Sequence, residues 1–230
     1  MRARSSSALA AATDGGTLRA VRTGPDFRET HELSDGTRVV LRHIRPDDAA
    51  GLRIAFERLS PESRYRRFFG GVAQLSDAAL RYLTQVDGTH HVAIVATRDS
   101  PDLKTETGVG VARFVRLADD PSVAEAAVTV VDDQQCKGLG HLLALTLSDA
   151  ARERGVRTFR AEVLASNEPM VAIMGEVGAH ARDARDGVVV YDVPLDAVPA
   201  ERGGVVDRLL RAAAVQMAVL LHRLAPPAPE

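Results

Sequence analysis

The chain has 230 residues, with 29 Lys and Arg against 31 Asp and Glu, so its formal net charge is −2. With 45% hydrophobic and 26% charged residues, the composition is typical of a soluble globular protein. The near balance of charge removes the electrostatic reason to expect a nucleic-acid partner, and no apolar run approaches the ~20 residues of a membrane-spanning helix. The single cysteine, Cys136, excludes an internal disulfide, and the scattered histidines indicate no metal site. We therefore expect a cytoplasmic protein without a membrane partner.

The two ends of the chain are expected to lie outside the main domain. Residues 1–28 are mostly small or polar and show no sustained periodicity, so we predict a mobile tail. Residues 205–224 predict an amphipathic helix with one apolar stripe, formed by Val206, Leu209, Leu210, Ala213, Met217, Leu220, Leu221 and Leu224. This stripe either covers the domain's own sheet or forms a homodimer contact.

Residues 37–195 alternate between strand and helix patterns and predict one domain. The expected strands are 37–44, 91–96, 108–117, 124–131, 158–165 and 187–193. The expected helices are 45–59, a short one from residue 60, one capped at residues 76 and 77, one from about 139 to 154, and 167–177. An antiparallel-looking first half followed by alternating strands and helices indicates an α+β fold, with a mixed, mostly antiparallel central sheet flanked by helices.

The segment from 131 to 143 carries the strongest chemical signal in the chain. A strand ends there, a loop with Gly138 and Gly140 follows, and a long amphipathic helix begins. The unpaired backbone N–H groups and positive end of a helix suit a phosphate, and glycine lets the backbone approach an anion closely. Leu143 stands where a dinucleotide-binding fingerprint requires its third glycine, and the chain has no P-loop. A tight strand-to-helix turn without a ligand remains the alternative.

The pattern Gln135-x-x-Gly138-x-Gly140 resembles the acyl-CoA-binding motif of the GNAT N-acetyltransferase superfamily. The order of elements over 37–195 is similar to that family's, and residues 56–69 resemble the bacterial subgroup that includes protein-lysine acetyltransferase catalytic domains. The resemblance implies a GNAT-like acyl-CoA N-acyltransferase fold and transfer of an acetyl group from acetyl-CoA to a primary amine, such as a protein lysine. No metal is implied.

The resemblance also implies which residues bind acetyl-CoA. They are Val130, Val131, Gln135, Cys136, Lys137, Gly138, Leu139, Gly140, His141 and Asn167. The backbone N–H groups of 135–140 are expected to hold the pyrophosphate. The strand end at 129–131 is expected to pair with the pantetheine arm, and an N–H there to polarise the thioester carbonyl. The Cys136 side chain is interpreted as a small filler beside this loop.

Glu125 is the candidate catalytic residue. It lies within an otherwise apolar strand, where strand statistics disfavour glutamate. An amine arrives as an ammonium at neutral pH, and a partly desolvated carboxylate can accept its proton. Family members often place a glutamate on this strand, acting directly or through a water. A glutamate on a solvent-facing side of the strand is the alternative.

One departure from the family pattern weakens the catalytic interpretation. Many family members carry a tyrosine in the helix after the asparagine, as the acid that protonates the departing thiolate, and Met174 occupies that place. A non-catalytic acyl-CoA-binding or regulatory module therefore remains an alternative. An acetyltransferase for a small-molecule amine is another, because the sequence does not name the acceptor.

Overall fold

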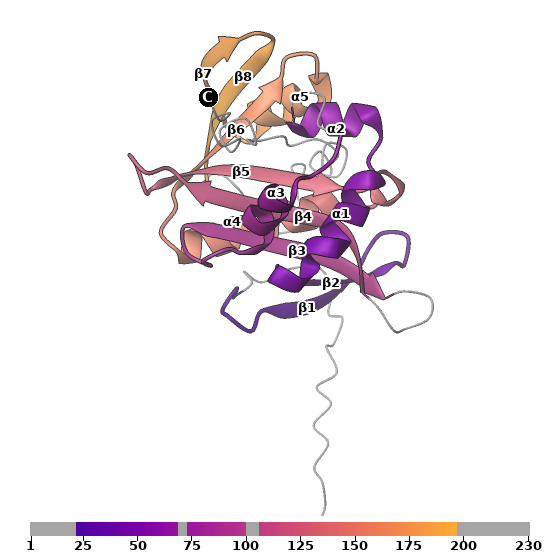
Figure 1. Ribbon diagram of the computed structural model, residues 1–230. Coiled ribbons are helices and arrows are strands. Elements are labelled where there is room, and N and C mark those ends of the chain that lie inside the picture. The colour runs from indigo at the N-terminus through magenta and orange to yellow at the C-terminus, as the bar shows by residue number, and fades with distance from the viewer. Residues whose placement is uncertain (1–21, 69–72, 100–105, 197–230) are drawn as a thin grey trace, which may run out of the picture.

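A computed structural model describes residues 22–68, 73–99 and 106–196. These residues form an eight-stranded sheet in the order β1-β2-β3-β4-β5-β6-β8-β7 (Figure 1). The strands are Arg28–Glu32 (β1), Arg38–His43 (β2), His91–Asp99 (β3), Glu106–Arg116 (β4), Val123–Val130 (β5), Thr158–Leu164 (β6), His180–Arg185 (β7) and Val188–Pro194 (β8). The helices are Ala49–Glu57 (α1), Pro61–Phe68 (α2), Asp77–Thr84 (α3), Leu139–Glu153 (α4) and Glu168–Glu176 (α5), with short 3-10 turns at Pro46–Asp48 (η1) and Asp132–Gln134 (η2). The predicted α+β fold with a mixed, mostly antiparallel sheet is confirmed.

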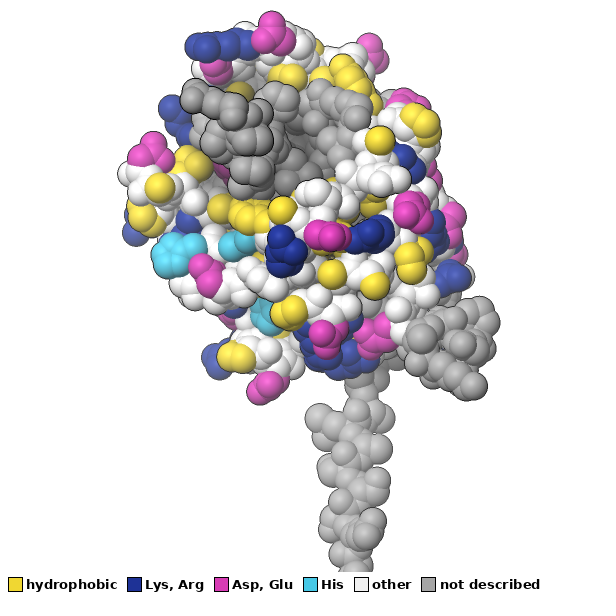
Figure 2. Space-filling model, in the orientation of Figure 1, with side chains coloured by type: hydrophobic (Ala, Val, Ile, Leu, Met, Phe, Trp, Pro, Cys, Tyr) yellow, Lys and Arg dark blue, Asp and Glu magenta, His cyan; other side chains and the backbone are white. Residues whose placement is uncertain are grey.

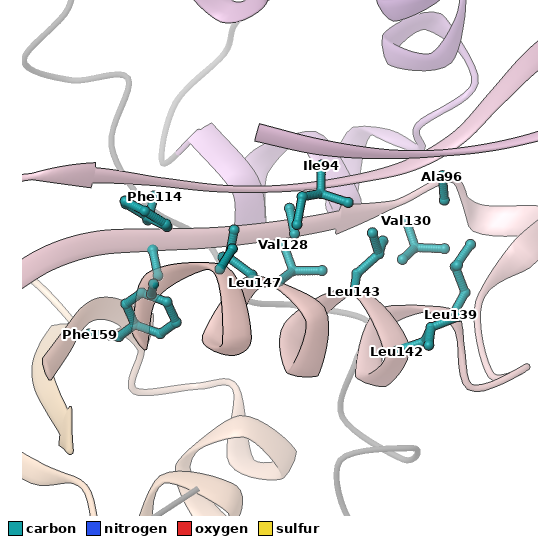
Figure 3. Close-up of a cluster of buried hydrophobic side chains, with 14 of the residues drawn as sticks. Ile94, Ala96, Phe114, Val128, Val130, Leu139, Leu142, Leu143, Leu147 and Phe159 are labelled. Carbon is teal, nitrogen blue, oxygen red and sulfur yellow. The ribbon is translucent and has the colours of Figure 1, made fainter. Parts of the chain in front are cut away.

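Helix α4 packs against one face of the sheet and supplies its main core. Its leucines at 139, 143 and 147 are at most 1% exposed and point toward the apolar side chains of β3, β4 and β5 (Figure 3). On β4, a Cβ at Gly110 would come within 2.9 Å of the Leu143 side chain, so the absent side chain lets the helix approach the strand. The 3.6-residue periodicity of α4 thus determines how it lies on the sheet.

The opposite face of the sheet carries the helices α1 and α3 (Figure 1). A second apolar cluster lies among these helices, formed by Phe56, Leu59, Leu75, Leu80 and Leu83. Alternate residues of β5 point to the two sides, because side chains alternate along a strand. Ala124, Ala126, Val128 and Val130 join the α4 core, so Glu125 and Thr129 face the side of α1 and α3.

Strands β5 and β6 are parallel and separate soon after they meet. Their register contains three pairs, and the last one joins Glu125 to Arg160. On its other edge, β5 stays paired with β4 as far as Val130. Beyond Glu125, the edge of β5 that faces β6 is therefore not paired with β6 in the described sheet. This wedge between β5 and β6 opens toward the start of α4.

Two strands of the sheet were missed by the sequence analysis. β1 alternates between exposed and half-buried residues, and all residues of β7 are exposed, so neither shows the apolar periodicity of a half-buried strand. β7 pairs with β8 through Asp186 and Gly187, which both have positive φ. An Asp-Gly pair is a strong hairpin signal, and it was available in the sequence. The predicted helix 45–59 is in fact a 3-10 turn followed by a shorter α1.

The N-terminal part of the fold begins earlier than the predicted boundary. The predicted mobile tail 1–28 ends inside the fold, because Thr23 and Phe27 are buried and β1 begins at Arg28. The Thr23 backbone and hydroxyl donate hydrogen bonds to Glu153 at the end of α4, and Arg154 donates to the Thr23 carbonyl and hydroxyl oxygens. The predicted helix 205–224 lies outside the described residues. None of the described helices is long and apolar enough to cross a membrane.

Candidate acyl-CoA site

The loop between β5 and α4 brings a helix N-terminus to the end of the wedge. Gly138 is the N-cap of α4 with φ +87, and a Cβ placed there would meet no atom within 4 Å. The residue is therefore required for its backbone conformation and not for tight packing. Leu142 N–H is the first to bond back into the helix, to Gly138 O. The N–H groups of the first turn have no carbonyl within the helix to bond, which suits an oxyanion.

The polar side chains before the loop fix its shape. Gln135 donates through Nε2 to Val130 O at 3.1 Å and to Asp132 Oδ1 at 2.9 Å. Asp132 also accepts hydrogen bonds from Ser60 N and Ser63 Oγ, both at 2.7 Å. The side chain of Gln135, like that of Asp132, is therefore used to hold the loop, and anion contact here falls to the backbone. The same bonds join the loop to the junction between α1 and α2.

Lys137 contacts the turn between β1 and β2. Its ammonium lies 3.0 Å from Asp35 Oδ2, and its carbonyl accepts a hydrogen bond from Ser34 Oγ. A backbone hydrogen bond from Thr37, followed by the bond from Lys137, lowers the pKa of the Asp35 carboxyl to about 2. Asp35 therefore stays ionised and holds the Lys137 side chain beside the phosphate loop.

Cys136 does not fill space in the described fold. Its residue is exposed, and its φ of 59 is unusual for a residue with a side chain. The interpretation of Cys136 as a packed filler is therefore wrong. The loop nevertheless needs residue 136 in a left-handed conformation, two residues before Gly138, to turn the chain into α4.

Glu125 lies at the closed end of the wedge, away from the phosphate loop. It is half-buried and pairs in register with Val115 on β4 and Arg160 on β6. Four residues at ~3.3 Å each put about 13 Å of strand between it and Thr129. The structure thus brings the loop and the strand end together, but it places the predicted base several residues deeper. Glu125 does face the same side of the sheet as Thr129.

A pocket on the face of the sheet that carries α1 adjoins the end of β5. It encloses about 790 Å³, including the part open to solvent, and Thr129 and Val131 lie in its wall beside Gly108, Gly110 and Val111 of β4. The rest of the wall is mainly apolar and comes from α1, α3, β3 and the segments that follow β2 and precede α3. Glu125 is not among the lining residues. A chemical group bound at the end of β5, beside Thr129 and Val131, would therefore face this pocket.

The pocket contains a charged residue that the sequence analysis missed. Arg113 on β4 lines it and is only 6% exposed. The available signal was the one used for Glu125, a charged residue within an apolar strand. Burial lowers the pKa of Arg113 to about 10, so the side chain stays charged at neutral pH. Burial, followed by the charge of Arg113, lowers the pKa of His91 to about 4.

The residues of α5 show why position 174 supplies no proton. Met174 is 3% exposed and belongs to the main apolar core. Asn167 precedes α5 and is buried, and its carbonyl accepts from the N–H groups of Met170 and Val171. A tyrosine in place of Met174 would have to enter the core, so the acid expected there cannot be restored by a simple exchange.

Positive and negative side chains are mixed on the face of the molecule that carries α1 and α3 (Figure 2). Figure 2 shows Lys and Arg side chains interspersed with Asp and Glu over the described part of the face that carries α1 and α3. Several pairs are direct ion pairs, such as Arg53 with Asp77 at 2.7 Å and Arg58 with Asp133 at 2.6 Å. No group of three or more His, Cys, Asp or Glu within the described ranges could hold a metal ion.

Comparisons with known proteins agree on one family. The profile of the acetyltransferase (GNAT) domain family matches residues 38–180. Acetyltransferase PA5475 of Pseudomonas aeruginosa is 33% identical over 162 residues, covering 69% of this chain and 84% of that protein. Acetyltransferase Pat of Mycolicibacterium smegmatis is 35% identical over 173 residues, covering 74% of this chain. The chain spans 50% of the length of this second relative.

A solved structure supports the same similarity. The crystal structure of the GNAT domain of S. lividans PAT superposes with a TM-score of 0.64 at 30% sequence identity. The match covers 73% of this chain and 96% of that domain. The similarity thus includes nearly all of the compared domain.

Proposed function

Because the chain belongs to the GNAT acetyltransferase family, we propose that it transfers the acetyl group of acetyl-CoA to a primary amine, and that this amine is a protein lysine. The observation that carries the proposal is the wedge between β5 and β6, which opens toward the N-terminus of α4. The strand edge and the phosphate-binding end of the helix lie in line with each other. This arrangement suits a molecule with a pyrophosphate and an extended amide arm. The subgroup resemblance over residues 56–69 supports a lysine acceptor.

Acetyl-CoA binding follows from this arrangement. The pyrophosphate lies on the backbone N–H groups from Cys136 to His141, beside the Lys137 ammonium that Asp35 holds in place. The pantetheine arm pairs with the β5 edge that faces the wedge, near Val130 and Val131, as a short extra strand, and Asn167 contacts the arm from the other side of the wedge. This brings the thioester toward Thr129 and the pocket. A backbone N–H of β5 then polarises the thioester carbonyl.

The chemical step releases two protons, one from the incoming ammonium and one from the nitrogen after it has attacked. The neutral amine attacks the thioester carbonyl, the carbon–nitrogen bond forms, the carbon–sulfur bond breaks, CoA leaves as the thiolate, and the second proton passes through water to this thiolate. Glu125 takes the proton of the incoming ammonium through bridging water, because the strand between it and Thr129 is too long for direct contact. A thiol with a pKa of ~8.5 leaves tolerably as a thiolate, so the step proceeds without an acid at Met174.

The test compares transfer by the wild type and by Glu125→Gln. Release of the CoA thiol is followed at pH 7 with acetyl-CoA and a lysine-containing peptide, and mass spectrometry locates the acetyl group. The Gln variant should bind acetyl-CoA normally and transfer ~10²-fold more slowly. Raising the pH should partly rescue it, because more amine then arrives deprotonated. Glu29→Gln, which alters a half-buried glutamate on β1, is the matched control.

Two other results would replace parts of the proposal. The pocket, with its apolar wall, favours a small-molecule amine as a second candidate acceptor; transfer to small amines but not to peptides would establish it. The burial of Met174 favours a non-catalytic acyl-CoA-binding module; tight acetyl-CoA binding with no transfer to any amine would establish that. Wild-type turnover by Glu125→Gln at pH 7 would remove Glu125 from the mechanism.

A further inference from the structure

Arg113 is the most unusual side chain in the pocket, because its buried guanidinium takes part in none of the ion pairs seen among the described residues. Its Nη1 and Nη2 groups both donate to the Leu83 carbonyl at 3.2 Å, and Nη1 lies 3.1 Å from His91 Nε2. These acceptors are neutral. The acidic lining residues Asp48 and Glu106 are already paired with Arg42, at 2.7 and 2.9 Å.

The remaining hydrogens of Arg113 lie on one edge of its guanidinium. An arginine has five N–H donors in a planar fork. Leu83 occupies the edge between Nη1 and Nη2, and His91 the outer hydrogen of Nη1. Nε is buried and has no hydrogen-bond partner. The hydrogens left over, on Nε and Nη2, form the side edge of the fork, which matches the two oxygens of a carboxylate.

The position of Arg113 relates this edge to the proposed reaction. Val111 pairs in register with Thr129, and Arg113 pairs with Ala127. Cross-strand partners share a face, so Arg113 lies on the pocket side of the sheet. It is two residues, or ~7 Å, along β4 from Val111, which lies opposite Thr129.

We propose that Arg113 forms a carboxylate-binding subsite, so that the protein prefers a reactant bearing a carboxylate a few carbon atoms from the reacting centre. This inference rests on the proposed function for its location. The carboxylate belongs either to the acyl group of the acyl-CoA or to the amine acceptor. Nε is shielded from solvent, so the side chains that cover it move aside when the carboxylate binds. Bound there, the carboxylate neutralises the buried charge and occupies both unused hydrogens.

Equilibrium binding tests the subsite independently of turnover. In the acyl arm, calorimetry compares succinyl-CoA with butyryl-CoA, which has the same chain length without the charge. In the acceptor arm, it compares 5-aminopentanoate with 5-aminopentanamide in the presence of CoA. A preference of about 10- to 100-fold for the carboxylate in one arm is expected from two charge-assisted hydrogen bonds, and that arm identifies the source.

The variants assign any preference to Arg113. Arg113→Met should remove the preference, and Arg113→Lys should reduce it, because an ammonium keeps the charge but lacks the fork. Arg116→Met is the matched control, since this arginine lies on the same strand and donates to the carbonyls of Thr89 and Pro121. If Arg113→Met fails to fold, the wild type still decides the question. Equal wild-type affinities within both pairs overturn the subsite. A preference without any acetyl transfer supports the subsite and contradicts the proposed activity.

Discussion

Two glycines with left-handed backbone conformations lie at the two ends of α4. Substitutions at both of them separate the effect of a residue's place in the fold from the effect of its backbone conformation. Gly138 has φ +87 at the N-cap, and Gly155 has φ +78 just after the last turn. Neither would place a Cβ within 4 Å of another atom. An L-residue at either site carries a similar strain of ~1–2 kcal/mol, but only Gly138 belongs to the proposed phosphate loop.

Gly138→Glu should therefore abolish acetyl-CoA binding, because a carboxylate at the helix N-terminus repels the pyrophosphate. Gly155→Glu should lose similar stability and keep the affinity. Calorimetric titration of both folded variants with acetyl-CoA measures the difference. Unchanged affinity in a folded Gly138→Glu protein would show that the pyrophosphate binds elsewhere.

His91 gives the fold a pH dependence of stability. Its pKa is about 4 in the folded state, lowered by burial and then by Arg113, against ~6.5 in an unfolded chain. Between these values the unfolded chain binds a proton that the folded protein does not. Stability from this residue is thus complete above about pH 6.5 and is lost as the pH falls toward 4, by an amount of up to ~3 kcal/mol.

His91→Gln should flatten this dependence, because the amide oxygen still accepts the Arg113 hydrogen bond and does not titrate. Urea unfolding of wild type and variant at pH 7 and pH 5 measures the effect. The neighbouring His90→Gln is the control, because its side chain is 72% exposed. An equal loss of stability on acidification in wild type and His91→Gln would exclude His91 as the cause.

At the scale of elements, α4 combines the phosphate loop at its start with the main packing surface of the sheet. Leu143 is fully buried and lies against Gly110 of β4. Leu143→Ala should lower the free energy of unfolding by ~2–5 kcal/mol, since it removes apolar contacts and leaves a cavity. Ile54→Ala on α1 is the control: its side chain is 55% exposed, so a change within ~0.5 kcal/mol is expected. Chemical denaturation gives both values, and a small change for Leu143→Ala would show that the core repacks around the space.

The elements also show what the sequence could predict. Helix α4 and strands β3 to β5 were identified because their apolar residues recur with a clear period, and Gly155 marks the helix end. Strands β1 and β7 carry charged residues on exposed faces, and their pairing with β2 and β8 holds them in the sheet. That pairing is a tertiary effect, which local periodicity does not report.

The candidate site was predictable in part for a similar reason. The loop at Gln135–Gly140 is contiguous in the sequence, so its motif and its helix could be recognised together. The pocket assembles residues from α1, α3, β3, β4 and β5, and only the sheet register places Arg113 beside Ala127. Contacts between residues far apart in the chain leave no short motif, and the neutral acceptors around Arg113 become visible only in the fold.

At the scale of the whole molecule, the predicted helix 205–224 bears on the oligomeric state. Its apolar stripe of eight residues must be covered, either by this domain or by a second copy. A chain truncated after Ala200 should lose thermal stability in the first case and halve its mass in solution in the second. Differential scanning fluorimetry and light scattering, run on the same samples, separate the two. An unchanged melting temperature with unchanged mass would show that neither contact exists.

The bonds between Thr23 and the end of α4 determine where an attached polypeptide starts. Thr23 is held by Glu153 and Arg154, and a 15-residue helix is ~22 Å long. An affinity handle or a fused protein joined directly to residue 22 therefore originates about one helix length from Gly138, at the end of α4 opposite the one proposed to bind the cofactor's pyrophosphate.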